Sequence, residues 1–335
     1  MNRIVGTALL LSLLGFIVLA QSKTGTTVGQ FTLIEPSARS AAMGGAGGTS
    51  SGEVMAGYYN PGALAALDHS DIQFTYNAWF ADIHLSYAAA AFRLGELGTV
   101  GLFVTHLGSG DINVTTVEQP QGTGERYSVN DLLVGVAYGY QVTDRFSAGI
   151  QVNYVTERIW HSSLANFGIN IGTLYQLSDD GLRIGASLVN FGTSDHYSGT
   201  DMQIRYDLDP ARYGDNSAIP GELTTDNFSL PIVFRVGLGY PWKFDESHTV
   251  NLAVDALHPS DNSECVNLGA EWVFRRILAL RVGYANLWQR DSEFGLTAGG
   301  GLMWDGLGYE IRFDYGWADH KRLGNVQRVT LGIGL

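Results

Sequence analysis

The sequence is short of cysteine, proline and charge. It holds one cysteine, Cys265, in 335 residues, which excludes a disulfide-stabilised scaffold and any zinc site built from several cysteines. Proline occurs only 8 times, and with plentiful aromatic residues this excludes a collagen-like or disordered chain. Basic residues number 20 against 33 acidic ones, a net charge of −13. A nucleic-acid partner is therefore not expected, because phosphate binding needs a basic surface.

Long hydrophobic runs are also missing beyond the N-terminus. After the first twenty residues no run of about 18 or more apolar residues occurs, so no transmembrane helix is expected in the mature chain. Glycine is in excess, at 43 residues, and aromatic residues make up 11% of the chain. A weakly charged chain with many aromatic residues favours β-structure.

Residues 1–20 have the pattern of a secretory signal peptide. Arg3 supplies the positive charge, residues 4–18 are apolar, and Ala20 ends a small-residue cleavage site. A membrane-anchor helix is the alternative, but the apolar stretch is short for one. We expect an exported protein.

From about residue 71 onward apolar side chains recur at every second position. In residues 309–317 bulky apolar side chains alternate with glycine or charged ones, which predicts a strand with one apolar face. About fourteen such segments occur, at 71–77, 83–94, 97–107, 130–142, 145–158, 163–177, 181–190, 230–242, 247–257, 263–274, 276–287, 292–304, 307–318 and 325–335.

The connections between these segments alternate in length. Those after even-numbered segments are short, whereas those after odd-numbered segments include the long stretches 108–129 and 191–229. Short turns on one rim and long loops on the other are typical of an outer-membrane barrel. We predict an all-β fold: a closed antiparallel up-and-down transmembrane β-barrel of about 14 strands, formed by residues 71–335 in the cell outer membrane.

Residues 21–70 differ from the barrel segments. They are small, polar and rich in glycine, and could not form a core of their own. We predict that they form a plug-like segment inside the lumen; the alternative is a flexible periplasmic leader.

The predicted inward face of the strands carries glycine and charge. The inward glycines leave room for other backbone, so bulky side chains at Gly237 or Gly299 should disturb the plug, whereas a change at loop residue Gly199 should be mild. The candidate lumen-facing charges are Arg183, Arg235, Glu271, Arg281, Arg312 and Asp314. They are interpreted as ion pairs that stiffen the lumen and hold the plug; a lining that selects a polar or anionic permeant is the alternative.

The long connection 191–229 keeps aromatic residues among many acidic ones. Long loops with aromatic residues are usually ordered and functional, which makes this loop the first candidate for a partner site. The candidate residues are Tyr197, Tyr206, Tyr213 and Phe228. A solvated external loop and a divalent-cation site are the alternatives.

No motif indicates an enzyme, a metal site or a cofactor. Residues 48–52 match the G-x-S-x-G spelling, but the strand and helix that this motif requires around it are not predicted. No phosphate-binding loop, His-Glu-x-x-His or calcium-loop pattern occurs. We expect no catalytic residues, no bound metal and no cofactor.

Two motifs before the barrel support a resemblance. Residues 37–46 read Ser-Ala-Arg-Ser-Ala-Ala-Met-Gly-Gly-Ala, and residues 59–64 read Tyr-Asn-Pro-Gly-Ala-Leu. In this layout the chain resembles the PorV/PorQ family, within the wider group of fourteen-stranded barrels that includes FadL-like transporters. The resemblance implies a plug in which the motif residues are Arg39, Gly44, Gly45, Asn60 and Pro61. In the wider group the second motif is usually Asn-Pro-Ala, and here Gly62 stands in the alanine position.

The resemblance implies two functions. The first is an accessory role in type IX-like secretion of Gram-negative bacteria, with secreted cargo or secretion-system proteins as partners. The second is FadL-like transport of a hydrophobic small molecule across the outer membrane. The inward face of glycine and charge favours the first.

Overall fold

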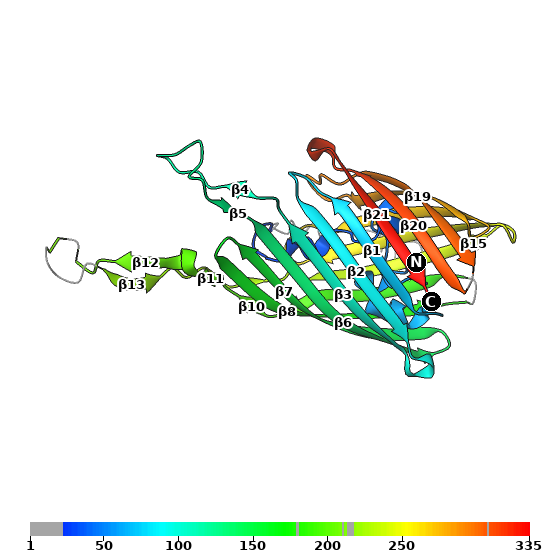
Figure 1. Ribbon diagram of the computed structural model, residues 1–335. Coiled ribbons are helices and arrows are strands. Elements are labelled where there is room, and N and C mark those ends of the chain that lie inside the picture. Colours follow the sequence, from blue (N-terminus) through cyan, green and yellow to red (C-terminus); the bar gives the residue numbers. More distant parts are fainter. Residues whose placement is uncertain (1–22, 179–180, 210, 213–217, 307) are drawn as a thin grey trace, which may run out of the picture.

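The computed structural model describes residues 23–178, 181–209, 211–212, 218–306 and 308–335. The predicted signal peptide and Tyr213 lie outside them. Within the described residues fourteen strands form a closed antiparallel barrel (Figure 1). They are β1 (Asp71–Ala78), β2 (His84–Arg93), β3 (Thr99–Gly108), β6 (Val129–Thr143), β7 (Phe146–Ile159), β8 (Ser162–Gln176), β9 (Arg183–Gly192), β15 (Val233–Lys243), β16 (His248–Pro259), β17 (Cys265–Phe274), β18 (Leu278–Leu287), β19 (Leu296–Gly306), β20 (Tyr309–Asp319) and β21 (Asn325–Gly334).

Each barrel strand pairs with the barrel strands before and after it in the chain. The first and last strands close the ring, with Phe74 of β1 opposite Leu331 of β21. Closure leaves no sheet edge with unpaired backbone groups, which a bilayer does not tolerate. The predicted strands and their up-and-down order are confirmed.

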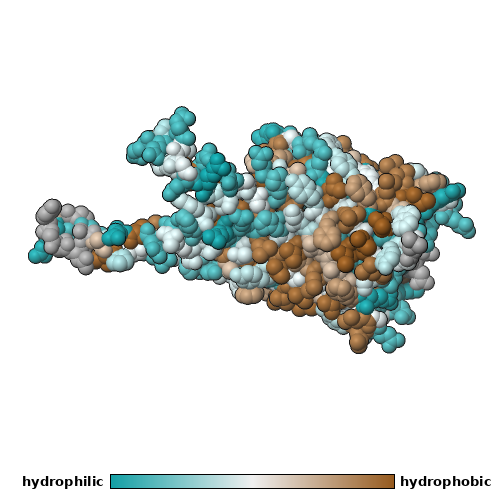
Figure 2. All heavy atoms as spheres, in the orientation of Figure 1, coloured by the Kyte–Doolittle hydropathy of each residue, from teal (hydrophilic) through white to brown (hydrophobic). Residues whose placement is uncertain are grey.

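The outer and inner faces of the wall have opposite chemistry. On β1, Phe74 and Tyr76 are 52% and 51% exposed, whereas their neighbours Gln73 and Asn77 are fully buried. Figure 2 shows apolar side chains gathered over the barrel wall and hydrophilic ones on the projecting loops. A surface that exposes apolar groups and buries polar ones suits a wall solvated by lipid outside.

One rim carries short turns, and by the usual orientation of such barrels it faces the periplasm. The opposite rim, called the outer rim below, carries two projecting hairpins (Figure 1). The β3–β6 connection contains β4 (Ile112–Asn113) and β5 (Arg126–Tyr127). The β9–β15 connection contains β10 (Ser194–Asp195), β11 (Ser198–Gly199), β12 (Gln203–Tyr206), β13 (Ile219–Glu222) and β14 (Phe228–Ser229).

The chain before the barrel forms four short helical elements. They are η1 (Gln30–Leu33), α2 (Ala38–Ala42), α3 (Ala56–Tyr59) and η2 (Pro61–Ala66). Three further helical turns lie in the loops between strands: η3 (Gly95–Leu97), η4 (Thr200–Met202) and η5 (Lys321–Leu323). α2 packs on β18 to β21, and η2 packs on β3 and β6 to β8 on the opposite wall. Among the described residues no helix is long and apolar enough to cross a membrane.

Candidate functional site

Arg39 of α2 is held by carboxylates. Its Nε and Nη2 donate to the two oxygens of Glu271 on β17 at 2.9 and 2.8 Å, and its Nη1 lies 3.4 Å from Glu53. The charge of Glu271 raises the pKa of Arg39 further, so the guanidinium is permanently charged. A bidentate pair of this kind sets the orientation of the guanidinium group relative to the carboxylate.

Gly44 and Gly45 follow α2 in the left-handed conformation, with φ of 69° and 76°. The Gly44 N–H donates to Oγ1 of Thr297 at 2.9 Å. A Cβ on Gly44 would lie 2.6 Å from the backbone oxygens of Leu268 and Tyr284. Glycine is therefore required here both for its φ and for the close approach to the wall.

Asn60 and Pro61 attach η2 to the opposite wall. The Asn60 side-chain oxygen accepts from the Gly62 N–H at 3.0 Å, and its Nδ2 donates to the backbone oxygen of Thr173 at 2.8 Å. Gly62, which stands where the wider group has alanine, would bring a Cβ within 2.8 Å of the Gly172 oxygen. The departure from Asn-Pro-Ala thus matches a wall that η2 approaches more closely than an alanine would allow.

The six candidate lumen charges all face inward, but they fall into separate groups. Arg281 pairs with Glu271 at 2.8 Å and with Asp314 at 2.5 Å, which joins three candidates to Arg39. Arg235 pairs with Asp255 at 2.9 Å, and Arg312 pairs with Asp71. Arg183, at the periplasmic end of β9, donates to Oγ of Ser51 at 2.6 Å.

Sequence reasoning missed Glu53 among these partners. It is 1% exposed and accepts from Nε2 of Gln73 at 3.0 Å as well as from Arg39. A signal was present, because Glu53 is the only charged residue between positions 40 and 67. That the ion pairs hold the N-terminal segment in place stays a prediction.

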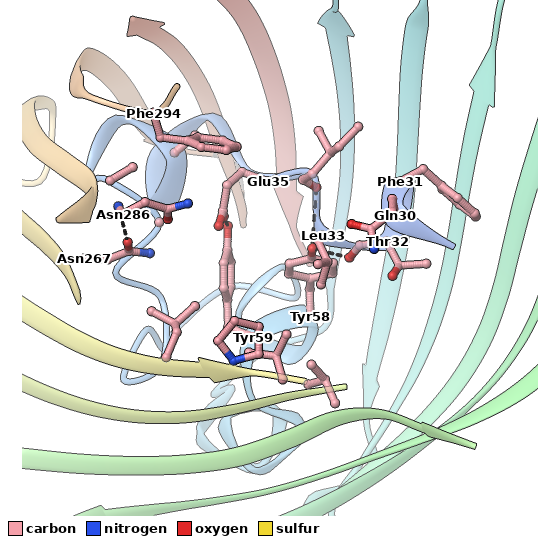
Figure 3. A pocket seen from close by; sticks show the side chains of 18 of the residues that line it. Gln30, Phe31, Thr32, Leu33, Glu35, Tyr58, Tyr59, Asn267, Asn286 and Phe294 are labelled. Carbon is pink, nitrogen blue, oxygen red and sulfur yellow. Dashed lines mark hydrogen bonds between the residues drawn. The ribbon is translucent and has the colours of Figure 1, made fainter. Parts of the chain in front are cut away.

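A cavity of about 560 Å³ lies in the outer half of the lumen, lined both by the N-terminal segment, including residues 30–35, and by the barrel wall. Figure 3 shows the Glu35 and Tyr59 side chains end to end in this cavity, and the Tyr59 hydroxyl donates to the Glu35 carboxylate. The Tyr58 hydroxyl donates to the backbone oxygen of Thr32 at 2.5 Å. Burial raises the pKa of Glu35 and of both tyrosines.

His320 forms part of the outer boundary of the cavity. Its ring packs against Trp79, Phe80 and Phe294, with ring centroids 5.2, 5.1 and 4.8 Å away. Burial lowers the pKa of His320 to about 4, and the nearby charge of Arg328 lowers it further. The ring is therefore neutral at physiological pH.

Glu157 on β7 joins the N-terminal segment to the long outer loop. It accepts from the Gly29 N–H at 2.5 Å and from the Tyr197 hydroxyl at 2.7 Å. The Val28 N–H donates to the backbone oxygen of Ser229, at the far end of the same loop, at 3.0 Å. Sequence reasoning did not single out Glu157, because nothing in its local pattern marks these distant contacts.

The candidate partner residues of the loop are split between two places. Tyr197 and Phe228 meet at the base of the loop, with their ring centroids 6.2 Å apart. Tyr206 lies in the projecting β12–β13 hairpin and is 53% exposed. Within the described ranges, no group of three or more His, Cys, Asp or Glu residues is arranged to hold a metal ion.

Comparison with known proteins identifies a family and a fold. A model of the family described as "Type IX secretion system protein PorV" matches residues 18–202, which is more than half of the chain. No curated protein matches the chain.

Solved structures with the same fold include two toluene transporters and a FadL homologue. The toluene transporter TbuX of Ralstonia pickettii is 16% identical, with a TM-score of 0.56 over 90% of this chain and 97% of that one. The toluene transporter TodX of Pseudomonas putida is 16% identical, with a TM-score of 0.56 over 88% and 96%. A FadL homologue of Pseudomonas aeruginosa is 12% identical, with a TM-score of 0.55 over 88% and 96%. Likeness at these identities shows the fold alone. Together with the closed barrel and the family match, it identifies the protein as an outer-membrane β-barrel.

Proposed function

Because the chain belongs to the family of the type IX secretion system protein PorV, we propose that it is an accessory component of protein secretion. It acts by binding exported cargo or other secretion-system proteins at its outer rim. It is a binding protein and not an enzyme, in keeping with the lack of catalytic motifs in its sequence.

The observation that carries this proposal is the β12–β13 hairpin, which projects well beyond the barrel (Figure 1). Tyr206, Leu208 and Leu223 are 53%, 73% and 52% exposed on it, although they lie outside the lipid-facing wall. Apolar side chains held in water by an extended hairpin favour burial against a protein partner. The hairpin also leaves strand edges on which a partner strand could pair.

The packing of the lumen supports a scaffold in preference to an open pore. The N-terminal segment contacts both walls, and its Ala38, Ala42 and Leu64 are fully buried. Polypeptide cargo could not pass through the lumen while this segment is in place. The partner surface is therefore expected on the loops.

The test replaces residues 203–222 by a short Gly-Ser linker in the chromosomal gene. We expect cargo to accumulate in the periplasm, and chemical crosslinking in native membranes to recover less cargo and fewer secretion components with the barrel. The matched control shortens the β4–β5 hairpin on the same rim, at residues 113–125, and should secrete normally. Unchanged secretion without residues 203–222 contradicts the proposal.

A FadL-like transporter is the second candidate, and the cavity of about 560 Å³ is the observation that favours it. On this hypothesis the N-terminal segment moves and a hydrophobic compound passes through the lumen. The barrel would then purify from native membranes without protein partners and with a bound hydrocarbon or lipid, detected by mass spectrometry. Recovery of crosslinked cargo with an unliganded barrel contradicts transport.

A further inference from the structure

One wall of the cavity holds unpartnered donors. Arg328 of β21 is 3% exposed, and its Nη1 donates to the backbone oxygen of Glu35 at 3.1 Å while its Nε has no partner. His320, 2% exposed, has an unpartnered Nε2.

The wall formed by β6 and β7 holds unpartnered acceptors. Asp131 is 8% exposed and Gln151 is 3% exposed; both line the cavity, and each has a side-chain oxygen without a partner. Buried polar groups of this kind cost free energy unless something binds them. The first wall therefore favours a ligand group that accepts hydrogen bonds, and the second favours a group that donates them.

Asp131 also lies directly opposite another carboxylate. Its cross-strand partner is Glu157, which lines the same cavity. Glu157 accepts from two neutral groups, the Gly29 N–H and the Tyr197 hydroxyl. Among the described residues no basic side chain forms an ion pair with Asp131 or Glu157, and like charges directly opposite in a sheet repel. A cationic group placed between them would stabilise both.

We propose that this cavity binds a zwitterion, with its ammonium group at Asp131 and its acidic group at Arg328. His320, which also lines the cavity, supplies a further hydrogen bond at the acidic end. This chemistry is found at the two ends of a short peptide and in the head group of an ethanolamine phospholipid. The proposal concerns the lumen and does not depend on the partner surface of the outer hairpin.

The dimensions suit a short extended molecule. β1, β2 and β3 lie between β21 and β6, so four strand steps of about 4.8 Å separate the two anchors by roughly 19 Å along the wall. The long Arg328 side chain shortens that gap, and an extended tetrapeptide spans up to about 14 Å. Tyr87, Leu107 and Leu133 line the cavity between the anchors and would contact its apolar groups.

The test is calorimetric titration of the full mature barrel in lipid nanodiscs with tetraalanine as the probe. Acetyl-tetraalanine lacks the ammonium group, and tetraalanine amide lacks the carboxylate. We expect tetraalanine to bind, and each blocked peptide to bind about tenfold more weakly or worse, the effect of losing a hydrogen bond to a charged group.

The variants assign each end of the peptide. Asp131→Asn should bind tetraalanine and its acetylated form equally, and Arg328→Gln should bind tetraalanine and its amide equally. Asp111→Asn and Arg126→Gln alter an exposed pair in the β4–β5 hairpin and serve as matched controls that should bind like the wild type. Heat-modifiable migration on a gel checks that each variant is folded.

Dihexanoyl-phosphatidylethanolamine replaces the peptide in a second series. Binding of this lipid but not of tetraalanine, with the same dependence on Asp131 and Arg328, supports the zwitterion site and identifies a lipid head group as its ligand. The proposal is overturned if neither probe binds, or if folded Asp131→Asn and Arg328→Gln variants discriminate between free and blocked peptides as the wild type does. Such a failure would leave cargo recovery by the outer hairpin unaffected.

Discussion

The two halves of the lumen differ in how they use charge. In the half next to the periplasmic rim, called the filled half below, α2 and η2 pack on the walls, and Glu271, Asp314 and Asp71 each pair with a guanidinium group. In the outer half the cavity remains. There Asp131 and Glu157 form no ion pair with any described residue, and Nε of Arg328 lacks a partner. The difference leads to the prediction that charges in the filled half hold the N-terminal segment, whereas charges in the outer half are available for a ligand.

The largest expected effect is in the filled half. Glu271→Gln leaves Arg39 and Arg281 without the carboxylate they share, and breaking a buried pair in this way typically costs about 3–5 kcal/mol. Urea unfolding in lipid vesicles, followed by heat-modifiable migration, measures the loss. Asp111→Asn, in an exposed pair, should cost at most about 1 kcal/mol. Equal losses of unfolding free energy in the two variants would contradict the prediction that the buried ion pairs stabilise the fold more than exposed ones.

The next largest effect is on the pH dependence of stability, through His320 in the outer half. The folded pKa of His320, about 4, lies below its ordinary value of 6.5, so the folded state favours the neutral ring. Its contribution to stability is complete above pH 6.5 and is lost as the pH falls toward 4, by up to about 3 kcal/mol. His320→Gln should therefore lose less stability than the wild type between pH 7 and pH 4 in the same unfolding assay. His258→Gln, an exposed control, should follow the wild type.

Overpacking the filled half should have a smaller effect. A bulky side chain at Gly237 would overlap Gly48 and Asp255, and one at Gly299 would overlap Ala42. Gly237→Leu and Gly299→Leu should therefore each lower the free energy of unfolding by about 1–3 kcal/mol and slow assembly into vesicles. Gly110→Leu, with nothing within 4 Å, is the control.

The expectation that a change at Gly199 would be mild does not suit the structure. Gly199 has a φ of 147°, and a Cβ there would overlap the backbone at His161 and Ser162, where β8 begins. Loop position alone did not reveal that Gly199 pairs with the barrel wall.

A Gly110→Leu variant as impaired as Gly237→Leu would contradict the prediction that Gly237 and Gly299 face inward.

The smallest effect tests the connection between the outer loop and the N-terminal segment. Tyr197→Phe removes one hydrogen bond to the Glu157 carboxylate, worth about 1.5 kcal/mol, and should speed hydrogen exchange at residues 27–30. Tyr206→Phe, on the exposed hairpin, should leave that exchange unchanged. Equal exchange in both variants would mean that the loop and the segment are independent.

The architecture was largely predictable, because it depends on local pattern. Period-two alternation marked the strands, and the lengths of the connections indicated which rim each turn belongs to. The candidate site was less predictable from the sequence. The Arg39 motif and the inward charges were found, but two of their partners were not. Glu53 lies in the N-terminal segment, outside any periodic pattern, and Asp71 is separated from Arg312 by 241 positions in the chain.

By itself, the sequence determined the class of fold, the number and order of the strands, and which side chains face lipid, because each depends on spacing along one strand or one turn. The tertiary structure alone decided which inward charges meet, where the lumen is filled and where a cavity remains. The closure of β1 on β21 brings Asn77 beside Arg328, more than two hundred residues later in the chain, and the return of the long loop brings Tyr197 to Glu157. Contacts of this kind depend on strand register and on the path of the N-terminal segment, and no local spacing encodes either.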